Sequence, residues 1–121
     1  MSRIGLSGCG RIGRLHAGNL AGRADLLFHS RSPASAAGFR QRFGGETAAG
    51  FQDVLASDVE AVVIATPPQM HCRQVVEALG AGKSVLVEKP LCTGPGEVEE
   101  IAAAAAAADG PFLMVAENYY Y

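Results

Sequence analysis

The sequence predicts an α/β protein with a doubly wound, mostly parallel sheet of six strands and helices on both faces. Short apolar runs alternate with longer helix-like segments along the whole chain, and the runs lack the polar alternation of a strand with one solvated face. Strands that are buried on both faces are typical of parallel sheets, because each crossover helix returns over the sheet. A three-layer αβα arrangement is therefore expected over residues 1–121, a normal length for one domain.

The first half of the chain gives two strand–helix pairs. Residues 3–7 form the first apolar run, and a helix is expected over 11–21 with Ile12, Leu15, His16 and Leu20 near one face. A second strand is expected over 25–29. The next helix, over 33–43, begins with Pro33, which is favoured in a first helical turn because its missing N–H would have no partner there.

The second half continues the alternation. A short strand at 46–49 and a short helix at 51–56 precede the most apolar run, Ala-Val-Val-Ile-Ala, which ends at Thr66-Pro67-Pro68. Gly82 ends the next helix, and Asp109-Gly110-Pro111 ends the last one. The remaining elements expected here are the strand at 61–65, the helix at 69–81, the strand at 84–87, the helix at 96–108 and the strand at 112–116.

Composition excludes several function classes. Ten Lys and Arg residues against twelve Asp and Glu residues give no basic excess, so neither nucleic acid nor a membrane surface is an expected partner. The three cysteines, Cys9, Cys72 and Cys92, have neither metal-ligand nor redox-motif spacing. Free thiols and the lack of a signal peptide in the first residues predict a cytoplasmic protein.

A glycine-rich turn follows the first strand. Gly8-Cys9-Gly10-Arg11-Ile12-Gly13 fits the pattern G-x-G-x-x-G between a strand and a helix. Gly8 allows a tight turn, Gly10 allows the backbone to approach a pyrophosphate, and Gly13 allows close helix–strand packing. The following helix offers free N–H groups to phosphates. The turn therefore predicts a dinucleotide-binding Rossmann domain; the alternative is a tight turn without a ligand.

The end of the second strand indicates which dinucleotide binds. An acidic residue is expected there to hold the ribose 2′-hydroxyl of NAD, but the chain has Ser30 and Arg31. A carboxylate would repel a 2′-phosphate, whereas a hydroxyl and a guanidinium can bond it. These residues therefore predict NADP as the preferred cofactor, with NAD as the alternative. Arg31 as a solvated charge, or stacked on the adenine, remains open.

Two further strand ends complete a family pattern. Thr66-Pro67-Pro68 follows the fourth strand, and Glu88-Lys89-Pro90 follows the fifth. Together with the glycine turn, the run 81–91 and Ala116-Glu117-Asn118-Tyr119, these segments resemble the glucose-fructose oxidoreductase and inositol dehydrogenase family, Gfo/Idh/MocA. The resemblance covers essentially the whole chain, and its most specific part is Glu-Lys-Pro after an apolar strand.

The resemblance implies a catalytic role for Lys89. A partly buried lysine beside the nicotinamide ribose can polarise or help deprotonate the alcohol that loses hydride. Glu88 would orient Lys89 or contact the cofactor ribose, and a cis peptide bond is expected before Pro90. An ordinary surface lysine is the alternative reading of Lys89.

The resemblance also implies residues along the cofactor. Thr66 and Pro67 would line the dinucleotide, His71 would cap or stabilise that loop, and Asn118 would point to the nicotinamide end. His71 is expected to be structural rather than catalytic. His16 and His29 are read as structural, one on a helix face and the other in a strand.

Family members continue with a domain that binds substrate, and the resemblance implies that this chain lacks it. The expected function is thus the cofactor domain of an oxidoreductase acting on a sugar or polyol, inactive alone. A non-catalytic dinucleotide-binding or interaction module is the alternative. Weak homo-oligomerisation is expected through the edge strand at 112–116 and Tyr119, Tyr120 and Tyr121, because unprotected edges and exposed aromatic residues favour pairing.

Overall fold

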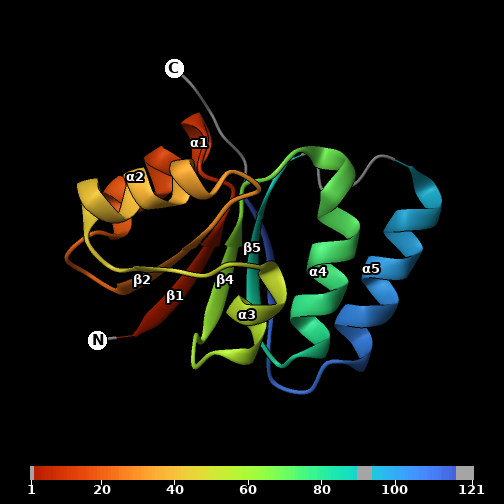
Figure 1. The fold of residues 1–121 in the computed structure, drawn as a ribbon. Coiled ribbons are helices and arrows are strands. Elements are labelled where there is room, and N and C mark those ends of the chain that lie inside the picture. The colour runs from red at the N-terminus through yellow and green to blue at the C-terminus, as the bar shows by residue number, and fades with distance from the viewer. Residues whose placement is uncertain (1, 90–93, 117–121) are drawn as a thin grey trace.

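The computed structural model describes residues 2–89 and 94–116, and within them six parallel strands form one sheet in the order β3-β2-β1-β4-β5-β6. The order reverses between β1 and β4, which is the arrangement of a doubly wound fold. Figure 1 shows the sheet near the centre of the molecule, with helices on either side of it. The strands are β1 (Arg3–Ser7), β2 (Asp25–His29), β3 (Glu46–Thr47), β4 (Ala61–Ile64), β5 (Ser84–Glu88) and β6 (Leu113–Ala116).

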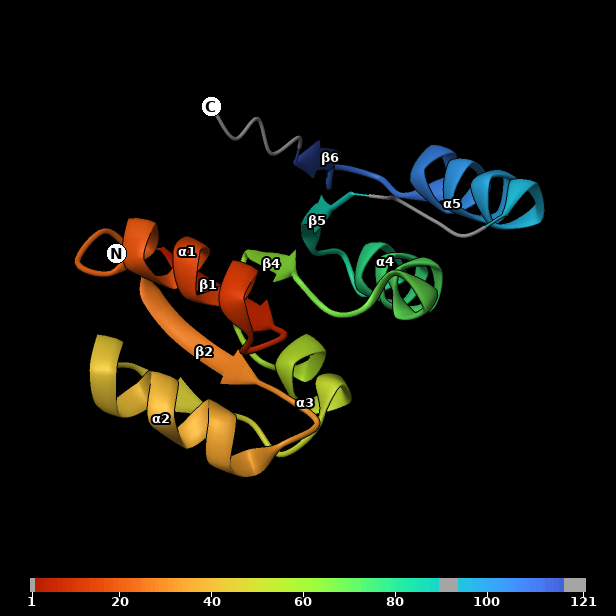
Figure 2. The same ribbon diagram turned by 90° about the horizontal axis from the view of Figure 1, so that it is seen from above.

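The helices lie on both faces of the sheet. In Figure 2, α1 (Arg11–Leu20) and α2 (Pro33–Phe43) lie on one side, and α3 (Phe51–Ala56), α4 (His71–Gly80) and α5 (Pro95–Ala107) lie on the other. A short 3₁₀ helix, η1 (Pro68–Met70), precedes α4. The predicted α/β fold with a doubly wound, three-layer αβα arrangement is confirmed.

Each face of the sheet has its own hydrophobic core. The core under α1 and α2 centres on Leu6, Phe28 and Phe39, with the rings of Phe28 and Phe39 edge to face at 5.6 Å. The core under α3, α4 and α5 centres on Val62, Val75 and Ile101. The strands that contribute to both cores are the apolar runs from which the sheet was predicted.

Helix α1 does not bury the face expected from the sequence. Its buried residues are Gly13 and Ala17, whereas Leu15 is 47% exposed. The reason is close packing: a Cβ at Gly13 would collide with the carbonyl oxygen of Gly8. The helix therefore approaches the sheet through its small residues, and the larger ones flank the contact.

Other differences concern element ends and the last strand. The strand expected at 46–49 is reduced to Glu46–Thr47, and the helix expected over 69–81 is divided into η1 and α4. Strand β6 is not buried on both faces as predicted, because Met114 is 56% exposed. No helix within residues 2–89 and 94–116 has both the length and the apolar character needed to cross a membrane.

Candidate dinucleotide-binding groove

The glycine-rich turn between β1 and α1 has the geometry that each glycine was predicted to provide. Gly8 has a φ of +105°, and a Cβ there would lie 2.5 Å from the carbonyl of Ala65. Its N–H donates to the carbonyl of His29 at 2.9 Å, which fixes the turn against the end of β2. By contrast, a Cβ at Gly10 would have no atom within 4 Å. The space over Gly10 is therefore open at the N-terminus of α1.

A groove of about 450 Å³ lies over this turn. It includes the ends of β1, β2 and β4, and none of the described residues that line it carries a carboxylate. Helix N-termini and guanidinium groups both favour anions, so the charge of this groove suits phosphate. The lining residues are Gly8, Cys9, Gly10, Arg11, Ile12, Ser30, Arg31, Ala65, Thr66 and Pro67.

A second hollow of about 440 Å³ continues the groove toward β5. Ile12, Ala65 and Thr66 line both parts, so the two form one path along the carboxyl ends of the strands. The other lining residues of this part are Pro68, His71, Glu88 and Lys89. The structure thus brings together the predicted residues at the ends of β1, β2, β4 and β5, while Asn118 and Pro90 lie outside the described residues.

A chain of hydrogen bonds runs beneath the groove. The Thr66 hydroxyl donates to Gln74 Oε1 at 2.5 Å, and Gln74 Nε2 donates to Ser7 Oγ at 3.2 Å. Ser7 Oγ lies 3.0 Å from His29 Nδ1. His71 Nε2 donates to the carbonyl of Thr66 at 2.7 Å, so His71 holds the loop after β4. These contacts fix the ends of β1, β2 and β4 relative to one another.

Burial changes the titration of two groups near the groove. It lowers the pKa of His29, partly offset by the carboxylate of Asp53, so His29 favours the neutral form. A neutral His29 can accept the Ser7 hydroxyl proton through Nδ1. Burial also raises the pKa of Cys9 to about 11. The Cys9 thiol is thus protonated at neutral pH, which argues against a nucleophilic role in the turn.

Glu88 and Lys89 have opposite environments at the end of β5. Lys89 is exposed, so the partial burial expected from the sequence is not found. Its backbone enters the turn at the end of the sheet, where solvent reaches the side chain. Glu88 is buried, and its Oε1 bonds to Nε2 of His16 on α1.

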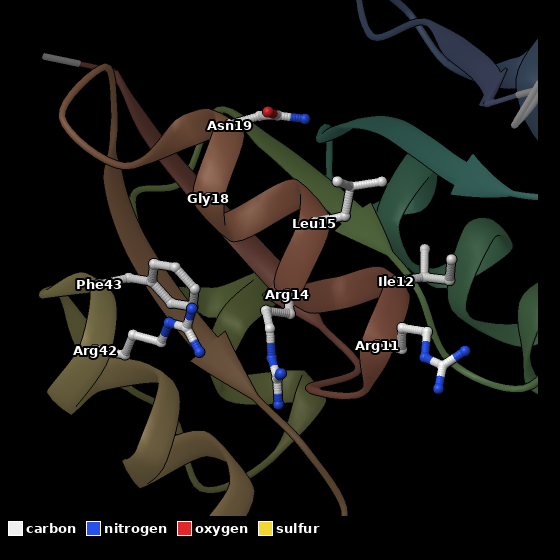
Figure 3. A pocket seen from close by; sticks show the side chains of 8 residues that line it. All are labelled: Arg11, Ile12, Arg14, Leu15, Gly18, Asn19, Arg42 and Phe43. Carbon is white, nitrogen blue, oxygen red and sulfur yellow. The ribbon is translucent and has the colours of Figure 1, made fainter. Parts of the chain in front are cut away.

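A larger cavity, of about 700 Å³, lies elsewhere, between α1 and the end of α2. Figure 3 shows Arg14 of α1 and Arg42 of α2 extending into the same space, with Leu15 and Asn19 farther along α1. Arg11 and Ile12 line both this cavity and the groove. In doubly wound sheets ligands bind at the carboxyl ends of the strands, so the groove is the candidate site despite its smaller volume.

Sequence reasoning missed three residues at this site. Ser7 and Gln74 were not singled out, and His16 was assigned only a structural place on its helix. The polar Gln74 at a buried helical position was a signal that was available in the sequence. His16 and Glu88 lie 72 positions apart, and no local pattern links them.

Comparisons with known proteins show which family this sequence matches. Residues 2–117 match the GFO_IDH_MocA model, described as an oxidoreductase family with an NAD-binding Rossmann fold. The chain is 38% identical over 93 residues to a dTDP-3,4-didehydro-2,6-dideoxy-alpha-D-glucose 3-reductase of Saccharopolyspora spinosa, covering 76% of this chain and 27% of that protein. It is 36% identical over 92 residues to an inositol 2-dehydrogenase of Rhizobium meliloti, covering 74% and 28%.

The fold comparison extends to a structure with bound ligands. A scyllo-inositol dehydrogenase from Lactobacillus casei, solved with NAD(H) and scyllo-inositol, has a TM-score of 0.88 at 29% identity. The match covers 95% of this chain and 36% of that one. The chain therefore spans between about a quarter and about a third of the length of these relatives.

Proposed function

Because the chain belongs to the Gfo/Idh/MocA oxidoreductase family as its NAD-binding Rossmann domain, we propose that the groove binds an extended nicotinamide dinucleotide with its pyrophosphate over Gly8–Gly13. The observation that carries this placement is the open space over Gly10 at the N-terminus of α1. A phosphate there can accept hydrogen bonds from backbone N–H groups without meeting a side chain. In this placement Gly8, Arg11, Ile12 and Gly13 shape or line the pyrophosphate site.

The two halves of the cofactor would occupy the two parts of the groove. Ser30 and Arg31 would face the adenosine ribose, with Thr66 and Pro67 along the middle. His71, Glu88 and Lys89 would lie at the nicotinamide end, together with Asn118. Lys89 would act there as the catalytic group that polarises or deprotonates the alcohol as hydride leaves its carbon for the nicotinamide.

We propose that NADP is preferred over NAD. The support is the absence of a carboxylate among the described residues lining the part of the groove at the end of β2, where Arg31 is exposed. A 2′-phosphate would gain a charge-assisted hydrogen bond from Arg31, and no carboxylate is among the described residues that line this part of the groove. The Lactobacillus casei relative carries NAD(H), so the preference has to be measured for this chain.

Titration calorimetry with both dinucleotides tests the binding and the preference. NADP should bind more tightly than NAD, and Arg31→Ala should weaken NADP by about 1–3 kcal/mol while leaving NAD nearly unchanged. Arg23→Ala is the matched control, since Arg23 is an exposed arginine at the opposite end of the sheet. Equal affinities in the parent chain would refute the NADP preference, and no binding of either would refute the site.

The whole protein would transfer hydride between the dinucleotide and a sugar or polyol alcohol. The named activities of the relatives support this substrate class. A second domain would supply the substrate contacts, because hydride transfer needs both reactants held at near-attack distance. The 121 residues alone should therefore bind cofactor without turnover. The alternative, a non-catalytic dinucleotide-binding module, would remain inactive even when a substrate domain is supplied.

We also propose that a chain of these residues associates weakly with a second copy. The support is the exposed apolar side chains of Phe112 and Met114, which lie at one edge of the sheet beside Leu86. These three residues are called the open patch below. Apolar side chains on an unprotected edge strand favour pairing.

A further inference from the structure

The contact between His16 and Glu88 joins two segments of the groove. Nε2 of His16, on α1, bonds to Oε1 of Glu88, at the end of β5. The side chains are 16% and 7% exposed, so neither is free to turn into solvent. Glu88 is the residue directly before Lys89.

A buried carboxylate needs hydrogen-bond donors, because a charge that is removed from water without them is strongly unfavourable. His16 supplies one such donor and thereby fixes the direction of the Glu88 side chain. No described residue hydrogen-bonds the ammonium group of Lys89, so its position depends on the backbone of the turn. Fixing Glu88 therefore fixes the point from which the Lys89 side chain extends.

Helix α1 also reaches the other part of the site. Ile12 lines both parts of the groove, and His16 lies one helical turn farther along α1. The helix whose N-terminus faces the pyrophosphate site is thus bonded to the strand that Lys89 directly follows. Displacement of α1 would move both parts of the groove.

We propose that His16 is a positioning residue that acts through Glu88 to place Lys89 at the nicotinamide end, an inference that rests on the proposed function. Loss of the contact should weaken binding of the nicotinamide half of the cofactor. It should leave the adenosine and pyrophosphate contacts in place, because Gly8, Gly10 and Arg31 line one part of the groove and Glu88 lines the other.

The test compares two ligands on the full 121-residue chain: NADPH, which has the nicotinamide and its ribose, and 2′-phospho-ADP, which lacks both but keeps the adenosine, the 2′-phosphate and the pyrophosphate. His16→Gln keeps an N–H near the place of Nε2, whereas the shorter His16→Asn cannot reach Glu88. His16→Asn should weaken NADPH binding by about three- to tenfold, the value of one lost hydrogen bond. His16→Gln should bind NADPH as the parent does, and both variants should bind 2′-phospho-ADP within about twofold of the parent.

Asn19→Ala is the control, because Asn19 is an exposed polar residue on the same helix. Equal weakening of both ligands by His16→Asn would show a merely structural role and overturn the inference, as would unchanged NADPH binding. Thermal unfolding of each variant accompanies the titrations, and the Gln variant provides the comparison if the Asn variant does not fold. If the parent binds 2′-phospho-ADP but His16→Gln and His16→Asn bind NADPH with equal affinity, the inference fails and the proposed function stands. If the parent binds neither ligand, the proposed function fails and the inference fails with it.

Discussion

The two faces of the sheet are covered to different extents. On the face of α1 and α2, the paired positions Phe28, Leu6, Val63, Leu86 and Met114 form one row across the strands. Phe28, Leu6 and Val63 are buried, Leu86 is half-buried, and Met114 is 56% exposed. On the opposite face, the row through Leu27, Val62, Val85 and Leu113 lies in the core under α3, α4 and α5.

The difference follows from the handedness of the crossovers. Strand order extends from β1 toward β3 in one direction and from β4 toward β6 in the other. Right-handed connections that run in opposite directions place their helices on opposite faces. Helices α1 and α2 therefore cover their face from β3 to β4, where Val63 is buried, but do not reach over β6 (Figure 2). The open patch is left exposed there. A doubly wound sheet cannot cover this area with its own crossover helices.

The largest expected effect is a difference in the free energy of unfolding between substitutions along the partly covered row. Leu6→Ala should lower the free energy of unfolding by about 2–5 kcal/mol, because it leaves a cavity in a closed core. Met114→Ala should lower it by less than about 0.5 kcal/mol, since the side chain is already in solvent. Leu86→Ala should lower the free energy of unfolding by an intermediate amount, because Leu86 is half-buried.

Urea denaturation of the three variants measures the series. Similar losses at positions 6 and 114 would mean that another part of the chain covers the open patch. In that case the exposure gradient along the row would not describe the protein in solution.

The next effect concerns association. Met114→Asp should weaken self-association of the chain without a comparable loss of stability, because it places a charge on the open patch. Val98→Asp is the matched control: Val98 is 48% exposed but lies on α5, on the opposite face. Light scattering over a concentration series measures both. A parent chain that stays monomeric at high concentration, or equal effects of the two variants, would contradict association through the open patch.

The smallest expected effect is a pH dependence of the free energy of unfolding, which arises from His29 on the face covered by α3, α4 and α5. His29 has its pKa lowered by burial from the usual 6.5, so between the folded pKa and about 6.5 the unfolded chain binds more protons than the folded chain. The stability contribution of neutral His29 is therefore present above pH 6.5 and is lost as the pH falls toward the folded pKa. His29→Asn keeps an acceptor for the Ser7 hydroxyl without titrating there.

The measurement is the urea midpoint of the parent chain and of His29→Asn between pH 5 and pH 8. The parent should lose stability more steeply than the variant as the pH is lowered below 6.5. Parallel profiles would show that the buried histidine contributes nothing to the pH dependence.

Local pattern was enough for most of the architecture. The apolar runs predicted β1, β2, β4, β5 and β6, whereas β3 is a short polar strand whose length was overestimated. The glycine spacing predicted a turn whose Gly8 and Gly13 have no room for a Cβ. The pattern failed at α1, where large apolar residues were expected to be buried but the buried residues are the small Gly13 and Ala17. It also failed at β6, because exposure of an edge strand depends on which helices reach it.

The sequence by itself therefore determined the order and type of the helices and strands. It also determined which strand ends carry the candidate cofactor-binding residues. Both properties depend on side chains that are neighbours along the chain. Only the tertiary structure decided which face stays open, how Ser7, Gln74 and Thr66 connect, and that His16 meets Glu88. These contacts depend on crossover handedness and helix–sheet distance, which bring together residues up to 72 positions apart. A short stretch of sequence cannot specify such contacts, because the distance between the side chains is set by the packing of the whole sheet.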